Sequence, residues 1–563
     1  MSARVRLAWW VTIVAVTLAV AHCRRVSLAE SPPPTTRAPV STGRSMKAGS
    51  LPGAPPITLT SSDGTGAELR TLSGRAVLEG PLAFTELRLG FVNPESRTRE
   101  GTFRIALPQG ASISRFAMLV GNQWQEGEVV ERQRAQAVYE DFLHRKRDPA
   151  LLEHSCGNEF SARVFPIPPH ATKELLVSYS EELLGAKPYV LPLVGLPRLG
   201  TAEVSVSASG SSRPFATLRE TDWAPASDFV VDRASVASGR GLRSGDLVLA
   251  RVQASTEPHP DPLGSAVVLV DTSASRALGL EEETRLLEEL SARLDRGDST
   301  WTVACFDQGV NEVYSGPRRG FGAAATEKIR ARGALGASDL SRALAWAQAR
   351  ARAVGAVRVL VVTDGVPTAG ETDRARLAAL VRAMAADGLQ RLDAIAVGGI
   401  RDGSLLRAIA TAGLERDGVA VDAGEGADVI ARRLGTATQS HLAVAVDGAS
   451  WSYPPTIDGV QAGDEFLVYA EVPDATTVAV SVGESTHLVL DLHPVERPLL
   501  ARAWAQAKIA SLLAHDGERR DDPASASHRA LVGLPRAQPL HGAARPRNGA
   551  GLRALRNRAH VAG

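Results

Sequence analysis

The stretch Ala266-Val-Val-Leu-Val-Asp-Thr-Ser-Ala-Ser275 decides the fold of this 563-residue chain. Its run of aliphatic residues predicts a strand that is buried on both faces, as in a parallel sheet covered by helices. The strand ends in an Asp-x-Ser-x-Ser sequence, at the edge of the sheet where open α/β folds bind their ligands. This sequence supplies the carboxylate of Asp271 and the hydroxyls of Ser273 and Ser275, which are oxygen donors of the kind that hard divalent cations prefer. The stretch therefore predicts an α/β fold and a cation site together.

Two further segments would complete such a site. Val359-Leu-Val-Val-Thr-Asp-Gly365 is a second aliphatic strand, and it ends in the carboxylate of Asp364 followed by a glycine that suits a tight turn. Between the two strands, the small-residue loop at 333–340 carries the hydroxyl of Ser338 just before a helical pattern. We predict that the three loops converge on one site. The ordinary alternative is that a serine after a strand-end aspartate only caps a helix, with its oxygen on a backbone N–H.

These five positions, taken in order, resemble the metal-ion-dependent adhesion site of the von Willebrand factor type A domain. The resemblance covers roughly residues 263–436 and implies a doubly wound, Rossmann-like α/β fold. It also implies a divalent cation, with Mg²⁺ expected and Mn²⁺ or Ca²⁺ as alternatives, and one coordination position left open for an acidic side chain of a protein partner. The metal ligands that the resemblance implies are Asp271, Ser273, Ser275, Ser338 and Asp364.

The chain departs from the type A pattern at two places. The family usually has threonine where Ser338 stands, and serine keeps the ligand oxygen. The family often has methionine where Arg276 stands, and we expect this arginine to place a positive charge near the rim of the site.

The segments between the motifs alternate between strand and helix patterns, which favours a parallel, doubly wound sheet. Amphipathic helices are predicted at 281–294 and 372–384, a strand with its hairpin partner at 301–306 and 310–314, and a further strand at 392–397. Apolar segments at 405–409 and 429–434 complete the pattern.

Residues 57–185 show the period-two alternation of strands, which predicts a β-rich, sandwich-like domain with one helix at 131–143. Their short motifs resemble the VIT domain, the vault and inter-alpha-trypsin module, which precedes a type A domain in bacterial-type proteins similar to inter-alpha-trypsin inhibitor heavy chains. The matching pieces are Phe91-x-Asn93-Pro94, Ala106-Leu-Pro108, Ala137-x-Tyr139-Glu140, Asp148-Pro-Ala-Leu-Leu-Glu153 and Phe165-Pro-Ile-Pro-Pro169. The covalent matrix linkage of those heavy chains is not implied, because their Asp-Pro-His segment is absent here.

The rest of the chain is divided by composition. Residues 1–25 have the basic and apolar pattern of a signal peptide, with a membrane anchor or a lipoprotein at Cys23 as alternatives, and imply an exported protein of the periplasm, cell envelope or exterior. We predict a Pro/Ser/Thr-rich linker at 26–56, a β-rich bridging segment at 186–262, and a small β unit with an amphipathic helix at 437–515. The basic stretch at 516–563 is predicted to be a disordered tail, or alternatively a sequence read out of frame.

The composition and the absence of several motifs argue against some classes of function. A formal net charge of +1 and the lack of a basic stripe argue against a nucleic-acid partner, and three scattered cysteines form no disulfide framework. The sequence lacks Gly-x-Ser-x-Gly, His-Glu-x-x-His and a phosphate-binding loop. We therefore predict a non-catalytic adhesion or binding protein that captures a partner carboxylate through its metal. A scaffold with a vestigial metal site is the alternative, and a hydrolase is less favoured.

Overall fold

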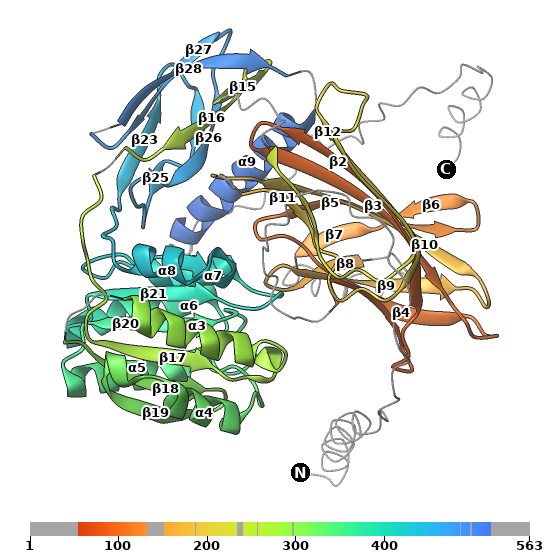
Figure 1. Ribbon diagram of the computed structural model, residues 1–563. Coiled ribbons are helices and arrows are strands. Elements are labelled where there is room, and N and C mark those ends of the chain that lie inside the picture. Colours follow the sequence, from red (N-terminus) through yellow and green to blue (C-terminus); the bar gives the residue numbers. More distant parts are fainter. Residues whose placement is uncertain are drawn as a thin grey trace, which may run out of the picture. The chain divides into compact units, whose positions relative to one another are not determined.

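The computed structural model describes residues 55–131, 151–185, 187–233, 240–255, 257–294, 298–484, 486–495 and 498–519 (Figure 1). These residues form a β sandwich, an α/β domain with an apolar core on each face of its sheet, a C-terminal β sheet and a C-terminal helix. A multidomain, β-rich chain with one α/β domain is therefore what the sequence predicts and what the structure contains.

Two mostly antiparallel sheets form the first domain of the chain. One has five strands in the order β1 (Ile57–Ser61), β4 (Arg99–Ala106), β9 (Glu159–Ile167), β8 (Leu151–Cys156) and β7 (Glu128–Glu131). The other has seven, in the order β13 (Ala216–Trp223), β12 (Leu199–Ala208), β2 (Glu68–Glu79), β3 (Leu82–Val92), β10 (Thr172–Glu182), β5 (Ser112–Val120) and β6 (Gln123–Glu126).

The alternating apolar residues of these sheets meet in one core. Phe91 of β3, Phe103 of β4 and Phe116 of β5 are fully buried, and the ring centroids of Phe103 and Phe116 lie 5.8 Å apart. Because strands from both sheets contribute to the same cluster, the sheets pack against each other as a sandwich.

The predicted bridging segment is β structure, and its strands are divided among three sheets. β12 and β13 extend the seven-stranded sheet, where β12 runs parallel to β2. β11 (Tyr189–Leu191) and β14 (Phe229–Val231) form a two-stranded pair. β15 (Gly241–Ser244) and β16 (Leu247–Gln253) instead join the C-terminal sheet. The sequence pattern predicted β structure in this segment but carried no information on the partners of its strands.

The α/β domain is built on a six-stranded sheet. Its order is β19 (Val310–Pro317), β18 (Thr300–Phe306), β17 (Ala266–Asp271), β20 (Arg358–Thr363), β21 (Arg391–Ala396) and β22 (Ala420–Asp422). Every neighbouring pair is parallel except β18 and the edge strand β19, which form the predicted hairpin.

Helices cover both faces of this sheet, as the uninterrupted aliphatic strands require. Val268 and Val270 of β17 belong to one core with α3 (Leu280–Arg293), α4 (Ala323–Arg332) and α8 (Ala427–Leu434). Val267 and Leu269 belong to the other, with α5 (Leu340–Val354), α6 (Arg374–Ala383) and α7 (Gly403–Ala410). Short 3₁₀ turns complete the domain: η3 (Ala274–Arg276), η4 (Arg318–Gly320), η5 (Met384–Asp387) and η6 (Ala423–Glu425). The sheet is thus doubly wound.

The C-terminal sheet has eight strands. Their order is β24 (Trp451–Tyr453), β26 (Glu465–Glu471), β16, β15, β28 (Thr486–Pro494), β27 (Thr477–Val482), β23 (Leu442–Val446) and β25 (Thr456–Ile457). The amphipathic helix predicted at 498–513 is α9 (Pro498–Arg519), which continues into the first residues of the predicted tail.

Several predictions fall outside the described residues. They are the signal or anchor at 1–25, most of the linker at 26–56, the helix at 131–143 beyond the end of β7, and the tail from 520 onward. Among the helices of the part that the structure describes, none has the length and apolar content to cross a membrane.

Candidate functional site

The candidate site lies where β17 and β20 end side by side. The two strands are parallel neighbours, so Asp271 at the end of β17 and Asp364 just after β20 reach the same edge of the sheet. After β17 the chain turns directly into the 3₁₀ turn η3, which carries Ser275. Ser338 precedes α5, whose first turn is capped by the carboxylate of Asp339 accepting from the N–H of Arg342 at 3.0 Å. Each predicted residue is therefore held by the end of a regular element.

Asp271 ties the three loops together. Its side chain is fully buried; Oδ1 accepts from the N–H of Ser273 at 2.9 Å, while Oδ2 accepts from the hydroxyls of Ser338 at 3.1 Å and Thr363 at 2.6 Å. Both carboxylate oxygens are thus used in orienting neighbouring groups. Asp271 therefore fixes the positions of the Ser338 and Thr363 hydroxyls, and its own approach to a cation would run through water, which Mg²⁺ retains readily.

The other three residues form the second half of the cluster. The hydroxyls of Ser273 and Ser275 lie 3.1 Å apart, and Ser275 Oγ donates to Asp364 Oδ2 at 2.5 Å. The remaining oxygen of Asp364 accepts from the N–H of Val366 at 2.9 Å. All five residues singled out in the sequence are thus connected by hydrogen bonds, with the N–H of Ser273 joining the two halves of the cluster.

The electrostatics of the cluster are those of two carboxylates buried together. Burial, with the charge of Asp271 as the next contribution, raises the pKa of Asp364 to about 6, against the opposing effects of Arg276 and of the hydrogen bond from Ser275. A positive charge beside a buried carboxylate stabilises its ionised form and lowers its pKa. A divalent cation would supply that charge.

Arg276 does not lie at the rim, so the expectation of an exposed positive charge was wrong. Its side chain is only 3% exposed and points into the domain, where its guanidinium donates to the carbonyl of Val397 at 2.9 Å. Nε lies 3.0 Å from Glu283 Oε1, and an NH group lies 3.7 Å from Asp364 Oδ2. Burial raises the pKa of Glu283 to about 8 despite this neighbour, so Glu283 balances the arginine only in part and Arg276 stabilises the charge of Asp364.

The donor set fits a small, hard cation. It consists of the hydroxyl oxygens of Ser273, Ser275 and Ser338 and the carboxylate oxygens of Asp271 and Asp364, which the hydrogen bonds hold close together. Carboxylate and hydroxyl oxygens are the ligand types that Mg²⁺ and Ca²⁺ prefer. Within the described ranges there is no group of three or more His, Cys, Asp or Glu side chains placed to hold a metal, so a cation here would depend on serine hydroxyls.

Sequence reasoning missed some supporting residues. Thr363 donates to Asp271, and Thr272 is fixed by hydrogen bonds to the carbonyl of Phe306 and from Arg332 Nε, while Arg332 also pairs with Asp307 at 2.7 Å. A signal was present for Thr363, because a polar residue inside an otherwise aliphatic buried strand requires a hydrogen-bond partner. The Arg332–Asp307 pair joins distant segments, and nothing in the local sequence points to it.

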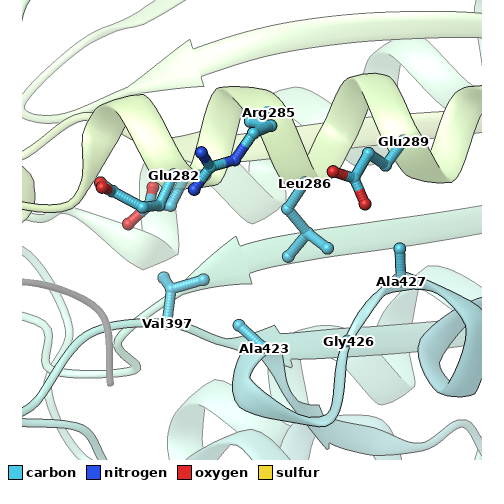
Figure 2. A pocket seen from close by; sticks show the side chains of 9 residues that line it. Glu282, Arg285, Leu286, Glu289, Val397, Ala423, Gly426 and Ala427 are labelled. Atoms are coloured by element: carbon cyan, nitrogen blue, oxygen red, sulfur yellow. The ribbon is translucent and has the colours of Figure 1, made fainter. Parts of the chain in front are cut away.

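A small hollow lies on the flank of α3 (Figure 2). It has a volume of about 140 Å³ and is lined by Glu282, Glu283, Arg285, Leu286, Glu289, Val397, Ala423, Gly426 and Ala427. Figure 2 shows Leu286 facing Val397 and Ala423 across it, with Glu282 and Glu289 on the same helix. Ligand pockets typically measure about 300–1,000 Å³, so the loop cluster at the sheet edge is the better candidate site.

The comparisons with known proteins concern both main parts of the chain. A family model described as the vault protein inter-alpha-trypsin domain matches residues 69–179, which run from β2 to β10. This agrees with the resemblance found in the sequence motifs.

Solved structures similar to the chain include several with type A domains. They include a von Willebrand factor type A protein from Catenulispora acidiphila (17% identity, 46% of this chain and 72% of that chain, TM-score 0.27). Another is the conserved hypothetical protein BatB from Bacteroides thetaiotaomicron (16%, 30% and 97%, TM-score 0.24). A third is the manganese-loaded TRAP protein of Plasmodium vivax (14%, 40% and 99%, TM-score 0.25). Scores of this size do not by themselves establish a common fold or function, so the type A assignment depends on the motif order and on the sheet that carries it.

Proposed function

We propose that this chain, which contains a vault protein inter-alpha-trypsin domain followed by a type A domain, is a non-catalytic binding protein that captures an acidic side chain of a protein partner through a divalent cation. The observation that carries the proposal is the convergence of Asp271, Ser273, Ser275, Ser338 and Asp364 at one sheet edge. When bound, the cation would supply a positive centre with an open coordination position for the partner carboxylate. Adhesion is the corresponding biological role.

The residues would share this work as follows. Ser273, Ser275 and Ser338 would present hydroxyl oxygens to Mg²⁺, or to Mn²⁺ or Ca²⁺ in its place, while Asp271 keeps the loops in position. Asp364 and Asp271 would balance the charge of the cation. Three neutral hydroxyls and two carboxylates, of which Asp271 would act through water, leave the cation electron-poor, which favours an additional anionic ligand.

Two further elements of the proposal come from the sequence. The absence of recognisable hydrolase and phosphate-loop motifs supports a non-catalytic protein, and the basic and apolar N-terminal pattern supports export to the cell envelope or beyond. A scaffold with a vestigial metal site is the competing function, and metal binding separates the two.

The first prediction is that Mg²⁺ raises the melting temperature of the full chain. A ligand that binds only the folded state stabilises it by about 2.7 kcal/mol at one hundred times its Kd. Ser338→Ala is expected to reduce the gain and Asp271→Ala to abolish it. Differential scanning fluorimetry with and without chelator provides the measurement, and calorimetric titration gives the Kd.

The control is Asp428→Asn in the same domain. Asp428 is strongly exposed and pairs with Arg293, away from the candidate site, so this variant should keep the full gain. An unchanged gain in both Asp271→Ala and Ser338→Ala would place the cation elsewhere, and no gain in the unmodified chain would favour the scaffold.

A further inference from the structure

The three loops that form the candidate site carry almost no exposed charge. Residues 272–279, 333–338 and 365–370 contain a single ionisable side chain, Arg276, and it is turned into the domain with 3% of its surface exposed. The remaining residues are small, hydroxylated or apolar. The loop residues themselves therefore add no exposed charge around the proposed cation, and the adjacent Arg332 and Asp307 are paired with each other.

Large apolar side chains stand in the same loops. Leu278 follows η3 and is 59% exposed, and Leu335 precedes Ser338 by three residues and is 70% exposed. Val366 and Pro367 of the third loop are half-buried. We call these four residues the apolar rim. A single exposed leucine is ordinary on a protein surface, whereas apolar residues gathered in all three loops of one site indicate a contact surface.

Backbone hydrogen bonds hold the three loops in a fixed relation to one another. The N–H of Leu335 donates to the carbonyl of Thr272 at 2.9 Å, and the N–H of Ala274 donates to the carbonyl of Gly336 at 3.0 Å. The third loop is joined in the same way, because the N–H groups of Thr368 and Ala369 both donate to the carbonyl of Ser338 at 2.9 and 3.0 Å. Little backbone conformational entropy is therefore left to lose when a partner covers these loops.

We infer that the partner segment presents its Asp or Glu between aliphatic side chains, and that the apolar rim selects for those neighbours. This inference rests on the proposed function, since the acidic side chain is the one captured by the cation. Aliphatic neighbours would bury Leu278 and Leu335, whereas charged neighbours would lose hydration against loop residues that carry no exposed charge of their own. The cation would bind the acidic side chain, and the apolar rim would distinguish between partner segments by the residues that flank it.

The test uses the full chain and three immobilised peptides under saturating Mg²⁺. They are Gly-Leu-Asp-Leu-Gly, Gly-Lys-Asp-Lys-Gly and Gly-Leu-Asn-Leu-Gly, displayed densely so that weak single contacts are measurable. The Leu-flanked acid is expected to bind about tenfold or more tightly than the Lys-flanked acid, from the apolar area buried. The Asn peptide and chelator treatment should both abolish binding.

Variants assign the preference to the rim. Leu335→Ser and, as a second variant, Leu278→Ser should lower affinity for the Leu-flanked peptide severalfold and leave the Lys-flanked peptide and the Mg²⁺-induced melting shift unchanged. Val489→Ser is the matched control, because Val489 is 76% exposed on β28 in the C-terminal sheet.

The outcomes separate this inference from the proposed function. Equal, Mg²⁺-dependent binding of both acidic peptides would overturn the apolar preference and leave carboxylate capture intact. Failure of every acidic peptide to bind, in a chain that Mg²⁺ does stabilise, would overturn carboxylate capture and the preference with it.

Discussion

Glu181 is a buried acid in β10 with an unusual environment. Its side chain is 6% exposed, its Oε1 atom has no hydrogen-bond partner among the described residues, and burial raises its pKa to about 8. Between about pH 4.5 and pH 8, Glu181 is therefore protonated in the folded chain and ionised in the unfolded chain, where its pKa is near 4.5. The contribution of Glu181 to stability is fully present below about pH 4.5 and is lost as the pH rises through about 8.

This assignment gives a pH-dependent prediction. Glu181→Gln removes the ionisation, so the variant should match the parent near pH 5 and become more stable than it by pH 8.5. The difference should grow by up to about 1.4 kcal/mol per pH unit inside the window. Urea unfolding at a series of pH values measures it, with Glu174→Gln on the same strand as the control; parallel pH profiles for parent and Glu181→Gln would contradict the assignment.

At the candidate site, residue types were predictable and side-chain directions were not. The oxygen donors at Asp271, Ser273, Ser275, Ser338 and Asp364 follow from motif spacing, because loops after neighbouring parallel strands meet at one edge. The direction of Arg276 does not follow from spacing. Its burial depends on Glu283 and on the carbonyl of Val397, which the fold brings in from other elements.

At the scale of elements, the strands of the α/β sheet are joined at their starting ends by a buried charge network. Arg358 begins β20 and Arg391 begins β21, and both donate to the carboxylate of Asp393, at 2.5 Å and 3.0 Å. Arg358 also donates to the carbonyl of Asp261, and Arg391 donates to the Asp261 carboxylate at 2.8 Å. Further bonds to the carbonyls of Leu434 and Thr436 connect the same arginines to the end of the domain. The network fastens the segments that enter and leave the sheet.

Removing the shared acid should therefore destabilise the domain strongly. Asp393→Ala leaves two buried guanidiniums with an incomplete set of partners, for which about 3–5 kcal/mol of lost unfolding free energy is expected. Glu203→Ala is the matched control, since its pair with Arg219 is exposed on both sides and should change stability by no more than about 0.5 kcal/mol. Urea titration followed by circular dichroism compares them, and a loss below about 1 kcal/mol in Asp393→Ala would show that the network contributes little.

The regular elements of the α/β domain could be predicted because their patterns are local. β17 and β20 are uninterrupted aliphatic runs, and α3 repeats its leucines at helical spacing. The charge network could not be predicted, because Asp261 and Asp393 are 132 positions apart in the printed sequence and their neighbours in the chain give no sign of pairing.

At the scale of the whole molecule, the sequence pattern could not predict which distant strands pair with each other. The strands β15 and β16 precede the α/β domain, yet they pair with β28 and β26, which follow it. Their alternating pattern predicts a strand without naming a partner, since any half-buried strand shows the same period. The α/β domain is consequently inserted between strands of one sheet.

The helix α9 joins that C-terminal sheet to the seven-stranded sheet of the first domain. Leu499, Leu500 and Ala503 of the helix share one buried cluster with Leu82 of β3 and Leu249 of β16. Leu500 is fully buried, so Leu500→Ala should lower the unfolding free energy by about 2–5 kcal/mol, whereas Leu512→Ala, at a position 44% exposed on the same helix, should have a much smaller effect.

Hydrogen exchange measured by mass spectrometry distinguishes a shared core from two separate ones. Because α9 contacts β3 and β10 as well as β15, β16 and β26, loosening the helix should increase amide exchange in both sheets together. Faster exchange in Leu500→Ala confined to the C-terminal sheet would mean that the first domain is stabilised independently of α9. Faster exchange in both sheets would mean that α9 stabilises the residues before and after the inserted α/β domain together. The α/β domain that carries the candidate site would then be attached to one cooperatively folded unit.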